Sequence, residues 1–331
     1  MRSACRSAAV CCFGLLAVAA AVAAQTQVEG VTAASGAVQR ARAFMLQGQR
    51  DSATELLGRH LSQQPNDGRA WFYLGSIYLA EAQHWHRAGH PPETSSASLL
   101  DFASTSFEPA QELLTDSGGV FRVLVAVERA VLRIEKAGWD SVAARKLAPD
   151  ELPLPPVLVE LGRNLLASCP RNGVLLTASL TETAAVWGTR LLGERSDLIL
   201  LRADMYQWDA RYRTPMARAL GADPAMDLAG ALAVAALTRP VCLAPAVDSI
   251  AGPGLAWHAN RLVLVTMAPA ATFAPPLSMF HFERTGLAGS VWTASARDVY
   301  DLAARRNRAL CTTLFAATDA LNPPAIPACS P

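Results

Sequence analysis

Two different patterns of apolar residues divide the chain. Between about residue 35 and residue 138, apolar side chains recur every three to four positions, as at Ala37, Ala41, Phe44 and Met45. This spacing is typical of amphipathic helices. Beyond residue 156, short continuous apolar runs alternate with helical stretches. Such alternation predicts βαβ units and a mainly parallel sheet. We therefore expect an α/β protein of two domains.

The expected domain boundaries follow composition. Residues 25–147 form helical hairpins, residues 148–156 (APDELPLPP) form a stiff proline-rich linker, and residues 157–331 form a Rossmann-like α/β domain with a C-terminal helix and tail. In the second domain we expect strands at 173–179, 197–204, 240–245 and 262–267. Helices are expected at 157–167, 182–192, 209–220 and 229–237, with a long closing helix at 295–319.

The helical region carries the spacing of a known repeat. The third predicted helix, which begins near residue 70, contains the spacing W-x2-L-G-x2-Y. In the segment just before it, residues 48–65, the turn, second-helix and closing positions of a repeat are found at the matching distances. The segment thus resembles the tetratricopeptide repeat (TPR), which implies stacked helical hairpins. Two imperfect repeats are too few to fold independently, so we expect them to pack against the second domain or a partner. Eight matching positions are assigned packing roles: Gly48, Ala53, Leu57, Pro65, Trp71, Leu74, Gly75 and Tyr78.

The first 24 residues predict an export signal. Arg2 and Arg6 precede an apolar run from Cys11 to Ala24, and the small residues Val22 and Ala24 fit a cleavage site before Gln25. The run is about 14 residues long, short of the roughly 20 that span a bilayer as a helix. We therefore expect a periplasmic or secreted protein with no transmembrane segment after cleavage.

Charge argues against a nucleic-acid partner. The full chain has 29 basic and 28 acidic side chains, and removing the two arginines of the signal leaves 27 basic against 28 acidic, a net charge of −1. A near-neutral chain lacks the electrostatic footprint of a nucleic-acid binder.

Four cysteines remain after signal cleavage, and they predict disulfides. An even number in an oxidising compartment favours pairing, with three connectivities open and buried free thiols as the alternative. In a sheet ordered 2-1-3, the first and third strands are parallel neighbours, so Cys169 and Cys242 would lie close together. Cys311 and Cys329 would then pair by elimination and hold the tail against the last helix.

Part of the second half also resembles a family. The stretch from Arg171 to Tyr206, followed by RPVCLAPAVDS and LAWHANRLVLVTMAP, resembles the soluble C-terminal region of bacterial membrane proteins related to protein O-mannosyltransferases. The likeness covers Leu161 to Ala317 and implies the fold. The family's acidic loop is largely lost at 178–181, and its multi-span membrane half is absent, which argues against transferase activity. Parts of the family pattern remain at Thr177, Glu182, Thr183 and Trp187.

Polar residues follow the predicted strands where open α/β sheets bind ligands. These candidate ligand-binding residues are Ser179, Thr181, Glu182, Thr183, Asp204, Tyr206 and Trp208. The alternative is structural, since Ser179 and Glu182 fit an S/T-x-x-E capping box. No G-x-G-x-x-G, phosphate-binding loop, G-x-S-x-G or H-E-x-x-H occurs, so we expect no cofactor and assign no catalytic residue. His84, His86 and His90 are interpreted as solvated loop residues, and no metal site is expected.

The sequence therefore favours a non-catalytic, exported interaction protein of the bacterial envelope. Its TPR-like helices would contact a protein partner, such as a membrane or envelope protein. The alternative is a ligand-binding or enzymatic accessory in envelope glycan processing that uses the strand-edge loops.

Overall fold

The computed structural model describes residues 36–87, 95–250, 255–267, 276–286, 290–316 and 326–329. The predicted signal peptide lies outside the described residues, as does His90, and no side chain is described for His86. Among the helices of these ranges, none combines the length and apolar character needed to cross a membrane.

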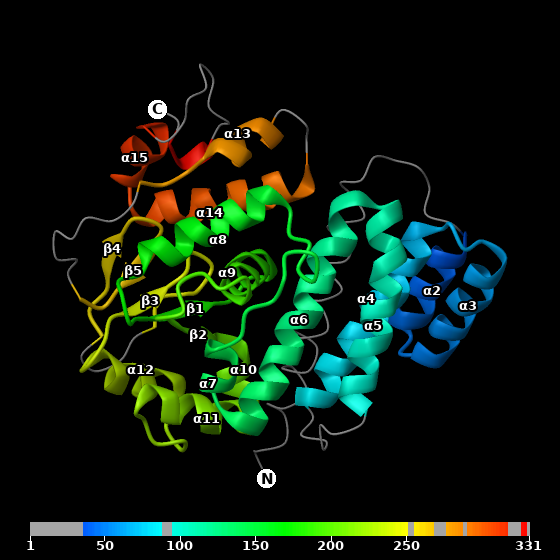
Figure 1. Cartoon of the computed structure of the whole chain (residues 1–331), viewed down its shortest axis with the longest axis horizontal. Helices are drawn as coiled ribbons and strands as arrows, with labels where there is room; N and C mark the ends of the chain where they lie inside the picture. Colours follow the sequence, from blue (N-terminus) through cyan, green and yellow to red (C-terminus); the bar gives the residue numbers. More distant parts are fainter. Residues whose placement is uncertain are drawn as a thin grey trace, which may run out of the picture.

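The N-terminal region is a stack of helices, as predicted. It comprises α2 (Gly36–Leu46), α3 (Arg50–Gln63), α4 (Gly68–Arg87), α5 (Ser95–Leu113) and α6 (Thr115–Ala137). Each helix packs on the next, and α4 also contacts α2 and α6 (Figure 1). The turn between α2 and α3 places Gly48 at φ +74°, a left-handed conformation that glycine adopts without strain. Residues 84–87, where His84 and His86 were expected in a loop, instead continue α4.

Close approach between α4 and α5 depends on a small residue. A Cβ atom at Gly75 would lie 2.7 Å from the ring of Phe107, so any larger residue would force the two helices apart. Phe107 is fully buried and contacts the rings of Phe72 and Phe121, at centroid distances of 5.7 and 5.4 Å. These three aromatic side chains join α4, α5 and α6.

A five-stranded sheet follows, in the order β2-β1-β3-β5-β4. Its strands are β1 (Val174–Thr177), β2 (Ile199–Arg202), β3 (Val241–Leu243), β4 (His258–Asn260) and β5 (Val263–Val265). β1 pairs parallel with β2 and β3, whereas β5 pairs antiparallel with both β3 and β4. The sheet is therefore mixed rather than mainly parallel. β4 was not expected because this edge strand is polar and largely exposed, so it has no apolar run to mark it.

Helices cover the sheet above and below in the view of Figure 1, with α8, α13 and α14 on one side and α11 and α12 on the other. They are α8 (Pro156–Ser168), α9 (Leu180–Leu191), α10 (Ala203–Trp208), α11 (Ala210–Leu220), α12 (Leu228–Ala236), α13 (Phe280–Gly286), α14 (Val291–Arg306) and α15 (Leu310–Ala316), with the short α7 (Asp140–Ala143) after α6 and the 3-10 turn η1 (Pro327–Cys329) in the tail.

Two expected elements are different in the structure. The strand expected at 197–204 ends at Arg202, and the next six residues form α10. The closing helix breaks into α14 and α15 at Asn307, whose backbone leaves the helical conformation at φ −137° and ψ 87°. The side-chain amide of Asn307 donates a hydrogen bond to the carbonyl of Arg261, 3.1 Å away, so a tertiary contact compensates for the break.

One continuous apolar core runs from α4 through α6 into the sheet and its helices. α6 packs against both α9 and α11, and Trp139 after α6 meets Trp187 of α9 with ring centroids 6.0 Å apart. The proline-rich segment lies in the same region, since a Cβ at Gly119 of α6 would approach the Pro153 carbonyl to 2.5 Å. A second, smaller core joins α2, α3 and the start of α4.

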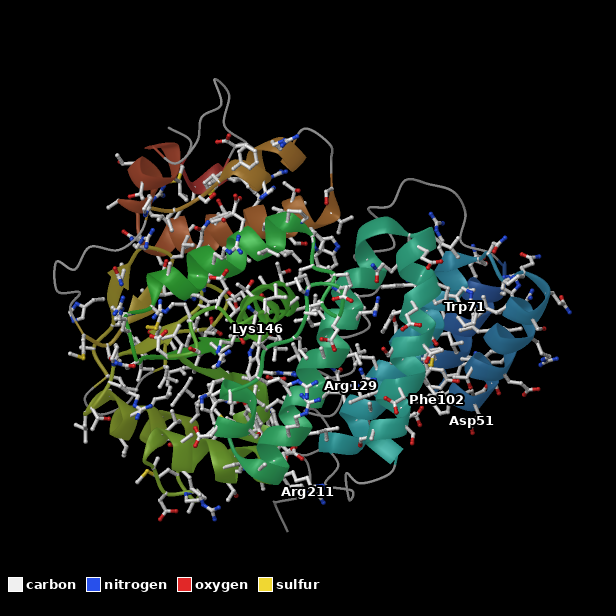
Figure 2. The ribbon with its side chains drawn as sticks, in the orientation of Figure 1. Asp51, Trp71, Phe102, Arg129, Lys146 and Arg211 are labelled. Carbon is white, nitrogen blue, oxygen red and sulfur yellow. A yellow bond between two sulfur atoms is a disulfide. The ribbon has the colours of Figure 1, made fainter. Side chains whose placement is uncertain are left out.

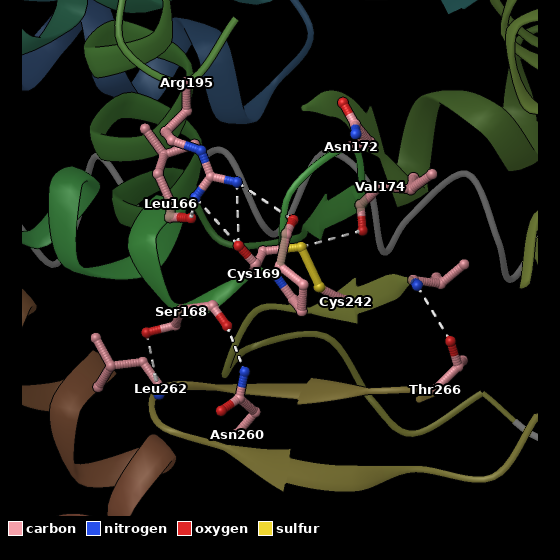
Figure 3. The surroundings of a disulfide bond; sticks show 12 residues. Leu166, Ser168, Cys169, Asn172, Val174, Arg195, Cys242, Asn260, Leu262 and Thr266 are labelled. Carbon is pink, nitrogen blue, oxygen red and sulfur yellow. Dashed lines mark hydrogen bonds between the residues drawn. A yellow bond between two sulfur atoms is a disulfide. The ribbon is translucent and has the colours of Figure 1, made fainter. Parts of the chain in front are cut away.

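The two disulfides have the predicted pairing. Cys169 joins Cys242 with a Cα–Cα distance of 5.9 Å, and Cys311 joins Cys329 at 5.4 Å. The first bond links the amino ends of β1 and β3, which are parallel neighbours as the prediction required (Figure 3). Arg195 supports this corner, because its guanidinium donates to the carbonyl oxygen of Cys169. Disulfides persist in oxidising compartments, so both bonds are consistent with an extracytoplasmic protein.

Candidate functional site

The first group of predicted ligand-binding residues lies at the carboxyl end of β1, where it caps α9. The Ser179 hydroxyl accepts a hydrogen bond from the Glu182 backbone N–H at 3.1 Å, and the Glu182 carboxylate accepts one from the Ser179 N–H at 3.4 Å. This is the capping box of the structural alternative. The hydroxyl of Ser179 and the carboxylate of Glu182 are therefore both used by the helix terminus.

Glu182 also joins two loops. Its carboxylate accepts a short hydrogen bond of 2.6 Å from the N–H of Ala246, in the loop after β3, and a longer one of 3.3 Å from Ala178. The side chain is fully buried. Burial raises the pKa of Glu182, while the three backbone N–H groups and the nearby Arg306 lower it, and the net direction is upward. A buried carboxylate with this set of donors holds the strand-edge loops together.

The two threonines beside the cap differ in access to solvent. Thr183 is buried, and its backbone N–H donates to the carbonyl of Ser179 at 2.9 Å. Thr181 is half-buried, so its side chain remains partly accessible at the edge of the sheet. Of the four residues predicted after β1, only Thr181 and part of Ser179 face solvent.

Asp204, after β2, belongs to an ion network. The guanidinium of Arg202 donates to Asp204 at 2.8 Å and to Glu128 of α6 at 2.6 Å. Gln83 of α4 donates to the same Glu128 carboxylate, also at 2.8 Å. Burial alone would lower the pKa of Arg202, but the two carboxylates raise it overall and keep the group charged. Asp204 thus helps to hold a buried cation between the sheet and the helical region.

The two predicted aromatic residues do not form a shared stacking surface. The Tyr206 side chain is buried, and its hydroxyl has no hydrogen-bond partner among the described residues. Burial raises its pKa. Trp208, two residues later in α10, is 60% exposed. One ring lies in the core and the other in solvent, so a ligand could stack on Trp208 alone.

The eight repeat positions lie in the helical stack. Ala53, Leu57 and Leu74 are buried, and Gly75 faces the Phe107 ring as described above. The Trp71 indole donates to the carbonyl of Pro65 at 2.7 Å, which joins the start of α4 to the preceding turn. The ring of Tyr78 lies 5.4 Å from that of Phe102.

Sequence reasoning missed a large cleft in the described part of the chain. It has a volume of about 1590 Å³ and lies between α6 and α7 on one side and α11 on the other, beside the residues that lead into β2. This is the amino end of the parallel strands, opposite to the predicted edge. The available signal was the helical spacing of Arg211, Thr214, Pro215 and Arg218 on one face of α11.

Within the described ranges, no group of three or more histidine, cysteine, aspartate or glutamate side chains is arranged to hold a metal ion. His84 lies exposed in α4. Comparison with protein-family models, with curated proteins and with solved structures finds no match to this chain.

Proposed function

We propose that this chain is a non-catalytic, exported interaction protein whose helical region presents a binding surface to a protein partner of the cell envelope. The α/β part serves as the support to which that surface is fixed. The observation that carries this proposal is the Glu128–Arg202–Asp204 network, because it uses strand-edge polar groups to anchor α6 instead of leaving them to a substrate.

This ion network fixes the orientation of the helical region relative to the sheet. Arg202 is held by carboxylates from α6 and from the start of α10, and Gln83 of α4 joins the network. A buried charge between two carboxylates is costly to separate, so the helical region stays docked on the sheet. A surface presented in one orientation loses less conformational entropy on binding than a mobile one.

An aromatic pair marks where a partner would bind. Phe102 of α5 is 55% exposed, and its ring contacts Tyr78 of α4. Figure 2 places Phe102 on the helical region, away from the sheet. Exposed Leu113 and Leu46 lie on the same helical stack. Aromatic side chains at a surface are frequent anchors of protein interfaces because they bury a large area with few rotatable bonds.

Several finer assignments belong to the same proposal. The packing of α4 on α2 and α6 supports a TPR-like stack, and the parallel arrangement of β2, β1 and β3 supports a Rossmann-like unit. The two disulfides support export to the periplasm or the medium. We also propose that the α/β part is related to the C-terminal region of O-mannosyltransferase-related proteins but does not share their activity.

Site-specific photo-crosslinking tests the proposed surface. A photoreactive phenylalanine analogue is placed at Phe102 in one variant and at Trp208 in another, since both side chains are aromatic and similarly exposed. Each variant is irradiated in envelope extract. We expect a discrete crosslinked product from position 102 that excess unlabelled protein suppresses, and none from position 208.

The converse result decides against the helical surface. A product from position 208 alone would favour the glycan-processing alternative or another use of the strand edge. Crosslinking from neither position would contradict a protein partner at this surface. A Phe102→Ser variant supplies the matched competitor, because it should fail to suppress the product at position 102.

A further inference from the structure

A cleft at the amino end of the parallel strands gathers positive charge. Four cationic side chains line it: Lys136 at the end of α6, Arg211 and Arg218 on α11, and Arg239 just before β3. Two acidic side chains, Glu135 and Asp140, also line it. The lining therefore has an excess of two positive charges on a chain that is nearly neutral overall.

Three of these cations are available to a ligand. Lys136 and Arg218 are exposed and Arg239 is half-buried. Within the described part of the chain, none of these three forms an ion pair. Cations grouped in a concave surface raise the local potential more than the same cations spread over a convex one.

The helix geometry sets the spacing of the charges. Arg211 and Arg218 are seven residues apart on one face of α11, which corresponds to about 10 Å along the helix axis. Figure 2 shows Arg211 near the lower end of α6. Lys136 lines the same cleft from the end of α6. A ligand with one small anionic group could engage only one part of this arrangement.

The cleft also has apolar walls and considerable size. Leu132, Ile199 and Pro215 contribute apolar surface between the charges. The volume of about 1590 Å³ exceeds the roughly 300–1,000 Å³ that is usual for pockets that hold drug-sized molecules. We propose that this cleft binds a small polyanion, an extended molecule whose two or more phosphate or carboxylate groups are held by Lys136, Arg218 and Arg239. The inference is independent of the protein-partner proposal, because it concerns another face of the molecule.

Calorimetric titration of the mature protein with two anionic probes tests the site. The probes are a short linear polyphosphate and tetragalacturonic acid, which separate phosphate from carboxylate as the preferred group, with neutral maltotetraose as control. We expect at least one anionic probe to bind, no binding of maltotetraose, and an affinity that falls as salt is added, because screening weakens charge attraction.

A matched pair of double variants assigns the binding to the cleft. Arg218→Gln with Arg239→Gln removes two unpaired cations of the lining, whereas Arg40→Gln with Arg59→Gln removes two arginines of α2 and α3. We expect the first variant to lose at least about tenfold in affinity, since each charged hydrogen bond contributes substantially. The second should change affinity less than about twofold, as surface charges far from a site contribute little. Circular dichroism and thermal unfolding check that both variants fold, and Lys136→Gln provides a third test at the end of α6.

Three results would overturn the proposal: no binding of either anionic probe to the unmodified protein, equal loss of affinity in both double variants, or full affinity after Arg218 and Arg239 are replaced. If neither anionic probe binds but an acidic peptide such as hepta-aspartate does, the proposal is also overturned, in favour of a protein ligand. Loss of the crosslink at Phe102 would leave these measurements unaffected.

Discussion

Replacing Glu182 by alanine separates a simple helix cap from a side chain that joins two loops. The Ser179→Ala variant is its matched control, because it removes only the cap bond to the N–H of Glu182. Glu182→Ala removes the reciprocal bonds to Ala178 and Ser179, and also the 2.6 Å bond from Ala246 in the loop after β3. The two variants therefore differ mainly in the contact between loops.

The expected magnitudes follow from these contacts. Loss of a helix cap costs about 1 kcal/mol, which is the full effect expected for Ser179→Ala. Glu182→Ala adds the loss of the hydrogen bond from the half-buried Ala246 N–H to a carboxylate, about 1–3 kcal/mol for a bond to a charged group. The total for Glu182→Ala is therefore about 2–4 kcal/mol of unfolding free energy. A cap alone, the simpler expectation from sequence, would make the two variants equal.

Urea unfolding at equilibrium, with both disulfides intact, measures the difference. The transition is followed by tryptophan fluorescence and by circular dichroism, and the dependence of free energy on urea should be the same in all three proteins. Equal destabilisation by Ser179→Ala and Glu182→Ala would refute the argument that Glu182 joins the loops. It would leave the carboxylate with a capping role only.

Three further predictions address the anchor, the pH dependence and the disulfides. Arg202→Met should cost about 3–5 kcal/mol by leaving the buried Glu128 carboxylate uncompensated, whereas Arg129→Gln, which breaks an exposed pair, should cost less than about 1 kcal/mol in the same urea assay. Because the pKa of Glu182 is raised in the folded protein, the folded state binds a proton at higher pH than the unfolded state does. Stability from this group should rise as pH falls from neutral toward 4.5, and Glu182→Gln should remove that slope in unfolding measured across the range. Serine substitution of the Cys169–Cys242 pair, which closes 73 residues, should cost about 4 kcal/mol, against about 3 kcal/mol for the 18-residue Cys311–Cys329 loop, as thermal unfolding would show.

Much of the fold is local enough to be predicted from sequence. The parallel strands β1, β2 and β3 are buried on both faces, so each appears as an uninterrupted apolar run. β4 has the residues His258, Ala259 and Asn260 and lies at the sheet edge, where burial imposes no pattern. The break at Asn307 is compensated by a hydrogen bond to Arg261, 46 residues earlier, and a contact so distant in the sequence leaves no local signal.

The polar residues of the strand edge were harder to interpret. The sequence shows which types of side chain follow each strand, but not which buried groups they must satisfy. Asp204 is used by Arg202, and that arginine is buried because Glu128 of α6 reaches it from 74 residues away. Tyr206 and Trp208 are two residues apart in a short helix, a spacing that places their side chains on different faces.

The cationic cleft is formed by residues whose grouping cannot be recognised from the overall composition. Its charges come from α6, from α11 and from the start of β3, three places far apart in the sequence, while the chain as a whole is nearly neutral. The position of Arg239 is tied to the disulfide, because Pro240 next to it accepts a 2.9 Å hydrogen bond from the N–H of Val174, and Cys242 two residues on is bonded to Cys169. The same covalent bond that supports an exported location thus also restrains the amino ends of β1 and β3, where one wall of the cleft begins. The proposed site therefore lies next to a covalent bond that persists in an oxidising compartment.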